Sequence, residues 1–596
     1  MENFGNFKHF GQNGAVIQAR MGHSPASDSN SRFQPRLNQA MPSGACELLG
    51  RQLSSVLAAL LFAASGAAPA TTASGATPPA TINARSPSFA DVSSAINSAN
   101  DGDTVVIPAG TAAWTTTLVI TKGITLIGQT TTDSVVGTAS DKTIIQDNVT
   151  RKGGPCPVIR VNSVSDKTYR ISGVTFAPLN TKLNSNGMIY LAGRSHAVRI
   201  DHCHFPIITS QSVLIGIWGA IWGVADHNIF ECLRIQSFNI NMADWPNPDG
   251  SAGVWGDGSW ATPTELGSEK FFFIEDNYFK NLTGTPGYGA YNEQGGNIDG
   301  SAGQRWVFRH NHCYETQMQN HGTEGLRQRG SRVREIYNND FHYAQSRHYG
   351  GSRSGVTITH DNTFDGRYPP QGLNLEAFRA FFKEPSYWEG GSGDNPWDVN
   401  DTKNGPFIEN GFSYNPVNGL YENGTATSGS TTTIVDSTKN WRPNQWVNFT
   451  AKRVSDAAIG FIQSNTSNTL TVVYAQYPTS PVWTAGNQYQ IRRPLILLDQ
   501  PGRGQGDLIT GTQPTNKTAG KTAWPNNALE PSYSWNDIYT PTGARVNFSV
   551  GTGNAALQKA GRDFYNNTPM PGYKVYTYPH PLVSGLAPPS NLRITP

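Results

Sequence analysis

Phe273-Ile-Glu-Asp-Asn-Tyr-Phe279 and Val307-Phe-Arg-His-Asn-His-Cys-Tyr314 are two copies of a phrase that decides the fold. Each copy has a short β-branched or aromatic run, in most copies an Asn, and then an aromatic residue two places later. The other copies are Gly173-Val-Thr-Phe176, Val198-Arg-Ile-Asp-His-Cys-His-Phe205, Ala225-Asp-His-Asn-Ile-Phe230, Glu335-Ile-Tyr-Asn-Asn-Asp-Phe341 and Val356-Thr-Ile-Thr-His-Asp-Asn-Thr-Phe364. The closest copies lie 23 to 29 residues apart, and a fixed period of that size indicates a solenoid.

The apolar run in each copy is too short for a helix and fits one strand per turn of the solenoid. We expect the recurring Asn to take a strained backbone conformation at a bend, and the stacked Asn side chains to bond to one another in a ladder. Cys203 occupies the Asn position and Cys313 lies near the aromatic position, so both are expected to be buried thiols.

The start of the coil is marked by an amphipathic segment, residues 88–103. Phe89, Val92, Ala95, Ile96 and Ala99 fall on one face, which predicts a short helix. Ser88 is the expected N-cap, and Asp101-Gly102 the expected end. Strand-like segments follow at residues 104–107, 118–120 and 124–128. Such a helix would cover the open first coil.

This opening and the repeats resemble the right-handed parallel β-helix proteins of the pectate-lyase-like superfamily. The resemblance covers residues 86–364 and resumes near Pro494. It implies an all-β fold, a right-handed parallel β-helix with an N-terminal helical cap and a small inserted β domain. The superfamily includes lyases, hydrolases, epimerases and phage tailspikes, so the fold alone does not fix the reaction.

The N-terminal region reads as a secretory signal. Arg51 precedes an apolar run over residues 56–70 that is short for a membrane span and ends in small residues, with cleavage expected after Ala70. Met21 or Met41 is a candidate start. We expect a mature protein that is secreted or at the cell surface, extracellular or periplasmic, without a stable membrane span after cleavage. A retained anchor is the alternative.

Changes of composition divide the chain. Residues 424–493 consist of short Thr/Ser/Asn-rich segments that are typical of strands, and they resemble an accessory module of bacterial and phage surface proteins. Residues 561–582 resemble the closing cover of secreted bacterial β-helix proteins. The expected organisation is an extension and signal peptide (1–70), a Thr/Ala/Pro-rich linker (71–87), the β-helix (88–410), the inserted β domain (411–493), the β-helix continuation with its cover (494–585) and a linker (586–596).

Overall composition excludes some partners. A net charge of +2 argues against a nucleic-acid binder. The cysteines form no pattern typical of a zinc site.

Both coil ends carry capping segments, so we expect a monomer.

Two segments between repeats, 231–270 and 281–304, read as insertions that would wall a groove for an extended polymer. Their aromatic residues are candidate sugar-binding platforms, and packing within the loops is an equal alternative. Asp299 and Arg305 follow the second insertion as candidate polar contacts. The candidate aromatic residues are Trp245, Trp255, Trp260, Tyr288 and Tyr291.

Arginines cluster after the second insertion. Ser331-Arg332 and Ser352-Arg353 are 21 residues apart, so Arg332 and Arg353 are expected to stack on adjacent turns. Stacked cations repel unless an anion lies between them, either an internal carboxylate or a substrate carboxylate, which Arg binds well. The alternative is ordinary pairing with Glu324, Glu335 and Asp340. The candidate catalytic residues are His321, Glu324, Arg327, Arg329, Arg332 and Arg353.

This region resembles the β-helix lyases that cleave alginate and dermatan sulfate, in which a basic residue precedes an Arg-His-Gly triplet by about one coil. Here Arg329 or Arg332 stands where that family has Lys, and Arg353 is followed by Ser-Gly. Arginine is a poor base at neutral pH, so His321, Tyr343 or Tyr349 would take the proton. The resemblance suggests Ca²⁺ as a cofactor and leaves its ligands unassigned.

The leading hypothesis is a lyase that cleaves an acidic, uronate-containing extracellular polysaccharide by β-elimination. A non-enzymatic glycan-binding adhesin or extracellular structural protein is the first alternative. A glycoside hydrolase is the second: Asp244, Asp249, Asp299 and Glu324 are available, without a defined spacing. The motifs of polygalacturonases are absent from the sequence.

Overall fold

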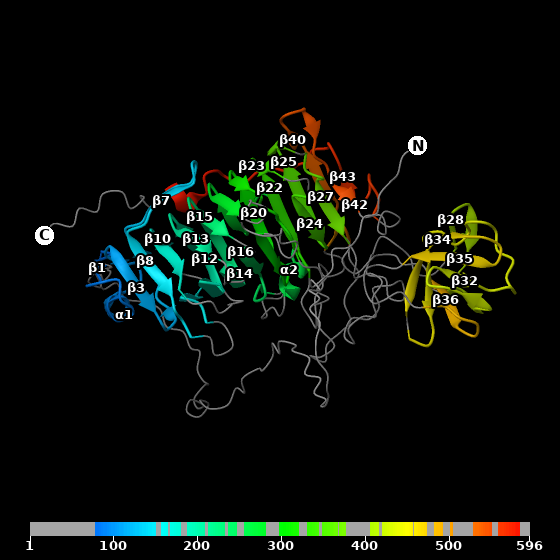
Figure 1. Ribbon diagram of the computed structural model, residues 1–596, viewed down its shortest axis with the longest axis horizontal. Coiled ribbons are helices and arrows are strands. Elements are labelled where there is room, and N and C mark those ends of the chain that lie inside the picture. The colour runs from blue at the N-terminus through cyan, green and yellow to red at the C-terminus, as the bar shows by residue number, and fades with distance from the viewer. Residues whose placement is uncertain are drawn as a thin grey trace, which may run out of the picture. The chain divides into compact units, whose positions relative to one another are not determined.

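The protein folds as a parallel β-helix. Its structure, a computed structural model, describes residues 78–150, 156–164, 167–179, 187–208, 213–232, 236–246, 256–281, 297–320, 330–344, 348–367, 369–376, 406–415, 420–456, 458–473, 482–492, 501–504, 528–550 and 558–584. Within each coil the chain runs through three strands, and each strand pairs in parallel with its counterpart in the next coil (Figure 1). We call the three stacks of strands sheets 1, 2 and 3.

Sheet 1 carries the apolar runs of the repeat. Its strands, in spatial order, are β1 (Thr81–Asn83), β2 (Thr104–Val106), β5 (Thr125–Ile127), β10 (Tyr169–Ser172), the second half of β12 (Ile189–Asp201), the second half of β14 (Val213–Asp226), β17 (Phe272–Glu275), β20 (Arg305–Arg309), β22 (Val333–Tyr337), β25 (Val356–His360), β39 (Ser532–Trp535) and β43 (Phe564–Tyr565). The pairing of β25 with β39 shows that the coil resumes after the inserted segment.

Sheet 2 carries the aromatic position of the repeat. Its strands are β3 (Gly110–Trp114), β8 (Thr143–Asp147), β11 (Thr175–Pro178), β13 (His204–Ile208), β15 (Ile229–Cys232), β18 (Tyr278–Asn281), β21 (His312–Tyr314), β23 (Asp340–Tyr343), β26 (Thr363–Gly366), β40 (Ile538–Tyr539) and the antiparallel β41 (Ala544–Arg545).

Sheet 3 is formed by segments that the repeat does not mark. Its strands are β4 (Leu118–Ile120), β9 (Ile159–Ser163), the first halves of β12 and β14, β16 (Gln236–Asn241), β19 (Ile298–Ser301), β24 (Gly350–Arg353), β27 (Leu373–Glu376) and β42 (Ser549–Val550). Met318 bridges β19 and β24. Both expected insertions, 231–270 and 281–304, therefore contain a strand of the coil, β16 and β19 respectively.

The expected N-terminal helix is present as α1 (Phe89–Ser98). The Ser88 side chain accepts a hydrogen bond from the Asp91 amide at 3.2 Å and caps it. Val92, Ala95 and Ile96 are buried, and the Phe89 ring meets Trp114 edge-on with centroids 5.7 Å apart. The helix ends three residues before the expected Asp101. Its apolar face covers the first coil.

The corner between sheets 1 and 2 differs from the expectation. The residue before the recurring Asn, and not the Asn itself, has the left-handed conformation, as at His227, Asp276, His310 and Asn338. Their φ values are 54°, 54°, 54° and 55°. One left-handed residue reverses the direction of the chain, which turns the next side chain, the Asn, into the coil.

The buried asparagines form the expected ladder. Asn228, Asn277, Asn311, Asn339 and Asn362 are each at most 1% exposed. Each Nδ2 donates to the Oδ1 of the next residue at 2.9 to 3.1 Å, and Asn362 donates to Asp537 at 2.8 Å. Each ladder therefore satisfies the buried amides and carbonyls of its corner.

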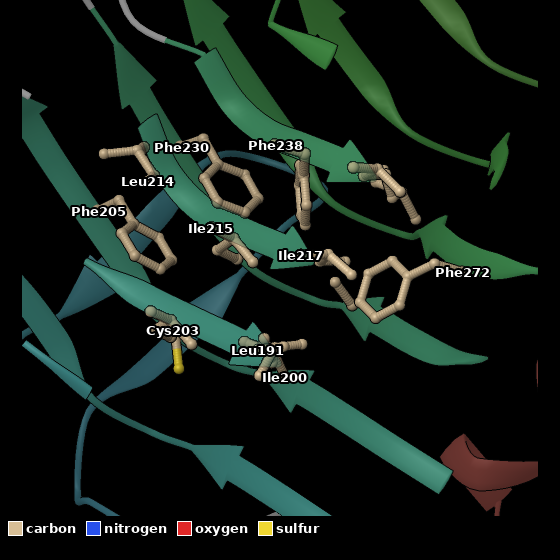
Figure 2. Packing of buried hydrophobic residues seen from close by; sticks show 14 of the residues in the cluster. Leu191, Ile200, Cys203, Phe205, Leu214, Ile215, Ile217, Phe230, Phe238 and Phe272 are labelled. Atoms are coloured by element: carbon tan, nitrogen blue, oxygen red, sulfur yellow. The ribbon is translucent and has the colours of Figure 1, made fainter. Parts of the chain in front are cut away.

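The aromatic position forms a second ladder. Phe176, Phe205, Phe230 and Phe279 stack with ring centroids 4.9 to 5.3 Å apart. Figure 2 shows Phe205 and Phe230 among the buried residues around them. Cys313 takes the next place, in register with Phe279 and Phe341. Cys203 takes the place of an Asn in the coil that precedes Asn228. Its backbone N–H donates a hydrogen bond to Asn228 Oδ1 at 2.9 Å. Both thiols are buried, as expected, and burial raises their pKa.

The C-terminal segment 573–583 runs back over the outer face of sheet 1. The Tyr573 hydroxyl donates to Glu335, the carbonyls of Tyr576 and Thr577 accept from Arg309, and the His580 amide donates to Glu275. The Leu582 carbonyl accepts from Arg199. We call this segment, which ends in α3 (Pro581–Ser584), the strap. It covers the side of the coil rather than its end.

A separate antiparallel sheet lies between residues 420 and 492. Its strands in order are β30 (Leu420–Thr425), β36 (Gln488–Arg492), β33 (Thr450–Arg453), β34 (Ile459–Asn465), β35 (Thr469–Val473), β32 (Thr433–Val435) and β31 (Ser428–Gly429). It has its own apolar core, which contains Trp441, Trp446 and Trp483. Residues 443–448, which precede β33, form turns rather than one of the short strands expected in this region.

The remaining elements are short: the hairpins β6 (Thr131–Asp133) with β7 (Thr138–Ser140), β28 (Phe407–Glu409) with β29 (Phe412–Tyr414) and β37 (Arg503–Gly504) with β38 (Ala528–Leu529), and the helix α2 (Asp257–Ala261). In the part of the chain that the structure describes, no helix has the length and apolarity needed to cross a membrane. The expected signal segment and the return to the coil at residue 495 lie outside the described residues.

Candidate functional site

The outer face of sheet 3 carries an ordered array of polar side chains. In β9, Ile159 and Val161 are buried while Arg160 and Asn162 are partly exposed, as alternation along a strand requires. In β16, Phe238 and Ile240 point into the core, and Asn239 between them is partly exposed. The same alternation places two polar side chains on the outer face of β9, Arg160 and Asn162, and Asn239 on that of β16, which begins with the partly exposed Gln236.

Parallel pairing places these side chains in rows along the coil. One row contains Arg160, Tyr190, Gly216, Asn239 and Asp299, which share one register on five consecutive strands. Neighbouring strands lie about 4.8 Å apart, so each row is a straight line of groups at that spacing.

A second row lies two residues further along the strands. It contains Asn162, Ala192, Trp218, Asn241 and Ser301. The two rows together line the outer face of sheet 3, where Arg160, Asn162 and Asn239 are partly exposed and Asn241, Asp299 and Ser301 are buried.

Hydrogen bonds between the rows fix the amides. Gln236 donates to Asp299 at 2.7 Å, Asn239 donates to Gln236 at 2.9 Å, and Asn241 donates to Asn239 at 2.6 Å. The hydroxyl and amide of Ser301 both donate to Asn241 Oδ1 at 3.0 Å. These side chains are thus held in one geometry before any ligand binds, which lowers the entropic cost of recognition.

Arg353 lies on the same face, at the β24 end. Its Nε donates to the Asn320 carbonyl at 3.1 Å, and its amide donates to Asn320 Oδ1 at 2.8 Å. It is not stacked on Arg332, because Val333 pairs with Val356 and the coil is therefore 23 residues long here. Arg332 is level with Gly355, so the expected stacking is wrong by two residues.

Arg332 and Arg305 are enclosed in the protein. Arg332 is fully buried, donates to Glu530 at 2.6 Å and to the Thr262 carbonyl at 3.0 Å, and lies over the Trp260 ring. Arg305 is also fully buried and donates to oxygen atoms of the loop 259–264. Burial, with the charge of Arg332, lowers the Arg305 pKa to about 9. Both therefore hold loops rather than face a ligand.

The two described tryptophans among the expected platforms are also buried. Trp245 is 4% exposed and lies under the Arg305 guanidinium, 4.5 Å from ring centroid to Cζ. Trp260 is 4% exposed, and its Nε1 donates to the Gly330 carbonyl at 3.1 Å. Packing, the alternative for these residues, describes them better than sugar contact. Asp299 lies in the polar row but is also buried, and its carboxylate accepts from Gln236 and from the Gly300 amide, so its role as a polar contact stays a prediction.

The other expected site residues fall outside the described residues. They are His321, Glu324, Arg327, Arg329, Trp255, Tyr288 and Tyr291. The candidate base Tyr343 is buried and donates to the Thr316 carbonyl, and Tyr349 is buried against Thr359. Burial raises the pKa of Tyr349 well above its usual range. Neither hydroxyl is placed to take a proton from a substrate.

Sequence reasoning missed Arg160, Tyr190, Gln236, Asn239 and Asn241. Their signal is the alternation in Ile159-Arg-Val-Asn-Ser163 and Gln236-Ser-Phe-Asn-Ile-Asn241. This alternation is short and shares no residue pattern with the repeat. It indicates a site only when the parallel pairing of the strands places these residues side by side. Among the described residues, no group of three or more His, Cys, Asp and Glu is arranged to hold a metal ion.

Comparisons with known proteins are limited. No family model matches the chain, and no curated protein matches it. Among solved structures, an alginate lyase from Paenibacillus sp. str. FPU-7 matches with 15% identity and a TM-score of 0.27, over 49% of this chain and 97% of that one. The strand registers themselves define the class of protein, a parallel β-helix with a polar face on sheet 3.

Proposed function

We propose that this protein is a secreted member of the pectate-lyase-like superfamily that binds an acidic polysaccharide along sheet 3 and cleaves it by β-elimination. The observation that carries the proposal is the pair of polar rows in one register on this face. Six inter-strand steps separate β9 from β24 by way of Met318. At about 4.8 Å per step the face is roughly 29 Å long, a length suited to an extended oligosaccharide.

The distribution of charge on this face favours an anionic polymer. Arg160 lies at one end, Arg353 at the other, and the amides of Asn239 and Asn241 lie between them. Arginine offers bidentate binding to carboxylates, and fixed amides bind sugar hydroxyls. A uronate polymer supplies both kinds of group in a regular repeat.

β-Elimination requires a base, a cation near the uronate carboxylate and a proton donor for the leaving oxygen. A base removes the proton at C5 of a uronate, the C4–O bond breaks, a C4=C5 double bond forms, and the leaving oxygen takes a proton. Cations near the carboxylate stabilise the charge that develops before the bond breaks. Arg353 is the described cation we assign to this role. Segment 321–329, with the candidate base His321, connects Asn320, which binds Arg353, to Gly330, which binds Trp260.

The test uses the full chain after signal cleavage. The protein is incubated with alginate, pectate, glucuronan and glycosaminoglycans, with and without Ca²⁺, and the ultraviolet absorbance of unsaturated uronates is followed. We expect a rise on one polymer, and its loss in Arg353→Ala. A matched variant is Arg545→Ala, an exposed arginine on β41, which should behave as the wild type. No absorbance change on any polymer would contradict the lyase proposal.

Glycan binding without cleavage is the second candidate. It is favoured by the enclosure of Arg332 and Arg305, which removes two cations from the expected reaction centre. Retention of the protein on an immobilised polymer, with no unsaturated product and no new reducing ends, would support it. New reducing ends without unsaturated product would instead indicate a hydrolase.

A further inference from the structure

One end of the polar face has ionisable groups that lack partners. Tyr190 is 8% exposed, and among the described residues no group hydrogen-bonds to its hydroxyl. The hydroxyl is not one of the enclosed polar atoms that lack a partner, so the ring is buried while the hydroxyl is open to a ligand. The hydroxyl lies on the outward side of β12, in register with Arg160 on β9.

Arg160 is held in place without using the end of its side chain. Its Nε donates to Asn162 at 2.8 Å, and its Cζ lies 5.6 Å from the Tyr190 ring centroid. Within the described part of the chain, its two terminal Nη groups make no hydrogen bond. The packing of a cation over an aromatic ring fixes the position of the guanidinium. Its donor groups are therefore oriented and available.

A second cation and a carboxylate belong to the same part of the fold. Arg194 lies four residues after Tyr190 on β12, roughly 13 Å along the strand, and is partly exposed. Asp244, which follows β16, is partly buried. Burial raises the pKa of Asp244, and Arg194 opposes that rise. Burial also raises the pKa of Tyr190 to about 12, so the hydroxyl remains a donor at physiological pH.

We infer that Arg160 and Tyr190 form a subsite that binds the carboxylate of one uronate residue. The Arg160 guanidinium binds the carboxylate oxygens and the Tyr190 hydroxyl donates to the same sugar, while Arg194, further along β12, adds positive charge to this part of the face. This inference rests on the proposed function for the location of the polymer. The subsite requires a negative charge at one defined position of the ligand, so uronate polymers should bind more tightly than neutral ones.

Binding measurements test the subsite independently of catalysis. Isothermal titration calorimetry compares uronate oligosaccharides from alginate, pectate and glucuronan with the same oligosaccharides after reduction of their carboxyl groups. The wild type should bind at least one uronate oligosaccharide and bind its reduced form at least about tenfold more weakly.

Three variants locate the effect. Arg160→Gln removes the charge and keeps much of the side-chain length, and it should weaken uronate binding about tenfold or more. Tyr190→Phe keeps the ring under Arg160 and removes only the hydroxyl, so a smaller loss is expected. Arg545→Gln on β41 is the control for the loss of one positive charge. Far-ultraviolet circular dichroism and thermal unfolding confirm that each variant is folded.

The outcomes separate this inference from the lyase proposal. Binding that depends on the carboxylate and on Arg160, without cleavage, would support the subsite and contradict the lyase. Normal cleavage and binding in both Arg160→Gln and Tyr190→Phe would overturn the subsite and leave the lyase intact. Equal binding of native and reduced oligosaccharides, or no binding of any of them by the wild type, would also overturn it.

Discussion

Asn339 shows how a single side chain can join three consecutive coils. Its Oδ1 accepts from both the amide and the Nδ2 of Asn311, and its Nδ2 donates to Asn362 Oδ1 and to the Phe308 and Tyr337 carbonyls. All of these groups are buried, so each would lose its partner if the side chain were removed.

Replacing Asn339 by Ala should therefore lower the free energy of unfolding by about 3 kcal/mol or more. The neighbouring Asn338 is the matched control, since it is exposed and has a φ of 55°. Asn338→Gly keeps that conformation accessible and should change stability by only a few tenths of a kcal/mol. Urea unfolding followed by circular dichroism measures both. Similar losses in the two variants would contradict a special role for the ladder.

Glu335 is a buried carboxylate under the strap. It accepts from the Tyr573 hydroxyl and, at 2.8 Å, from the Gly267 amide. Burial raises its pKa to about 7, and these hydrogen bonds together with Arg309 oppose the rise. A folded-state pKa above the unfolded one means that the protonated form is favoured by folding.

The stability from Glu335 should be fully present below the unfolded pKa of about 4.3 and be lost as the pH rises through about 7. The full effect is on the order of 3 kcal/mol. Glu335→Gln keeps a hydrogen-bond acceptor and cannot ionise, so its unfolding midpoint should fall less between pH 5 and pH 8 than that of the wild type. Parallel pH profiles for the two proteins would rule this out.

At the scale of elements, the strap is fixed to four strands of sheet 1. Its backbone and hydroxyl groups meet Glu335 on β22, Arg309 on β20, Glu275 on β17 and Arg199 on β12. Tyr578 also stacks on His310, with ring centroids 3.7 Å apart. Arg309 also pairs with Glu275 and Arg199 with Asp226, and the strap supplies further hydrogen-bond partners for these buried charges.

Gly267 provides a test of this docking. A Cβ at this position would lie 1.8 Å from the Lys574 carbonyl oxygen, and its φ is 73°. Gly267→Ala should therefore displace the strap and speed hydrogen exchange of the backbone amides in residues 573–583. Gly572→Ala is the control, because its φ is 74° and no atom lies within 4 Å of the added Cβ. The control carries the backbone strain without the clash, so equal exchange in both variants would contradict the proposed contact.

At the scale of the whole molecule, the three sheets have different outer faces. Sheet 1 is covered by the strap. Sheet 2 carries pairs such as His204 with Asp141 and His342 with Asp365. Sheet 3 carries the fixed amides and the arginine at each end. The lyase and subsite predictions both belong to this scale, because they depend on sheet 3 being the face that takes the polymer.

The sequence determined the coil, its corner asparagines, its aromatic ladder and its helical cap, because each is a local pattern repeated at a fixed period. It did not determine which residue of the corner is left-handed. Asn and its predecessor are both polar and adjacent, and only inward packing decides between them.

Only the tertiary structure decided the candidate site. Arg332, Arg305, Trp245 and Trp260 are polar or aromatic residues at or near the ends of elements. Whether such residues face solvent depends on distant partners such as Glu530. The rows on sheet 3 combine strands whose lengths and connections vary, so their register exists only after the coil has closed. Local pattern fixes the repeat unit, and the stacking of those units fixes which side chains meet.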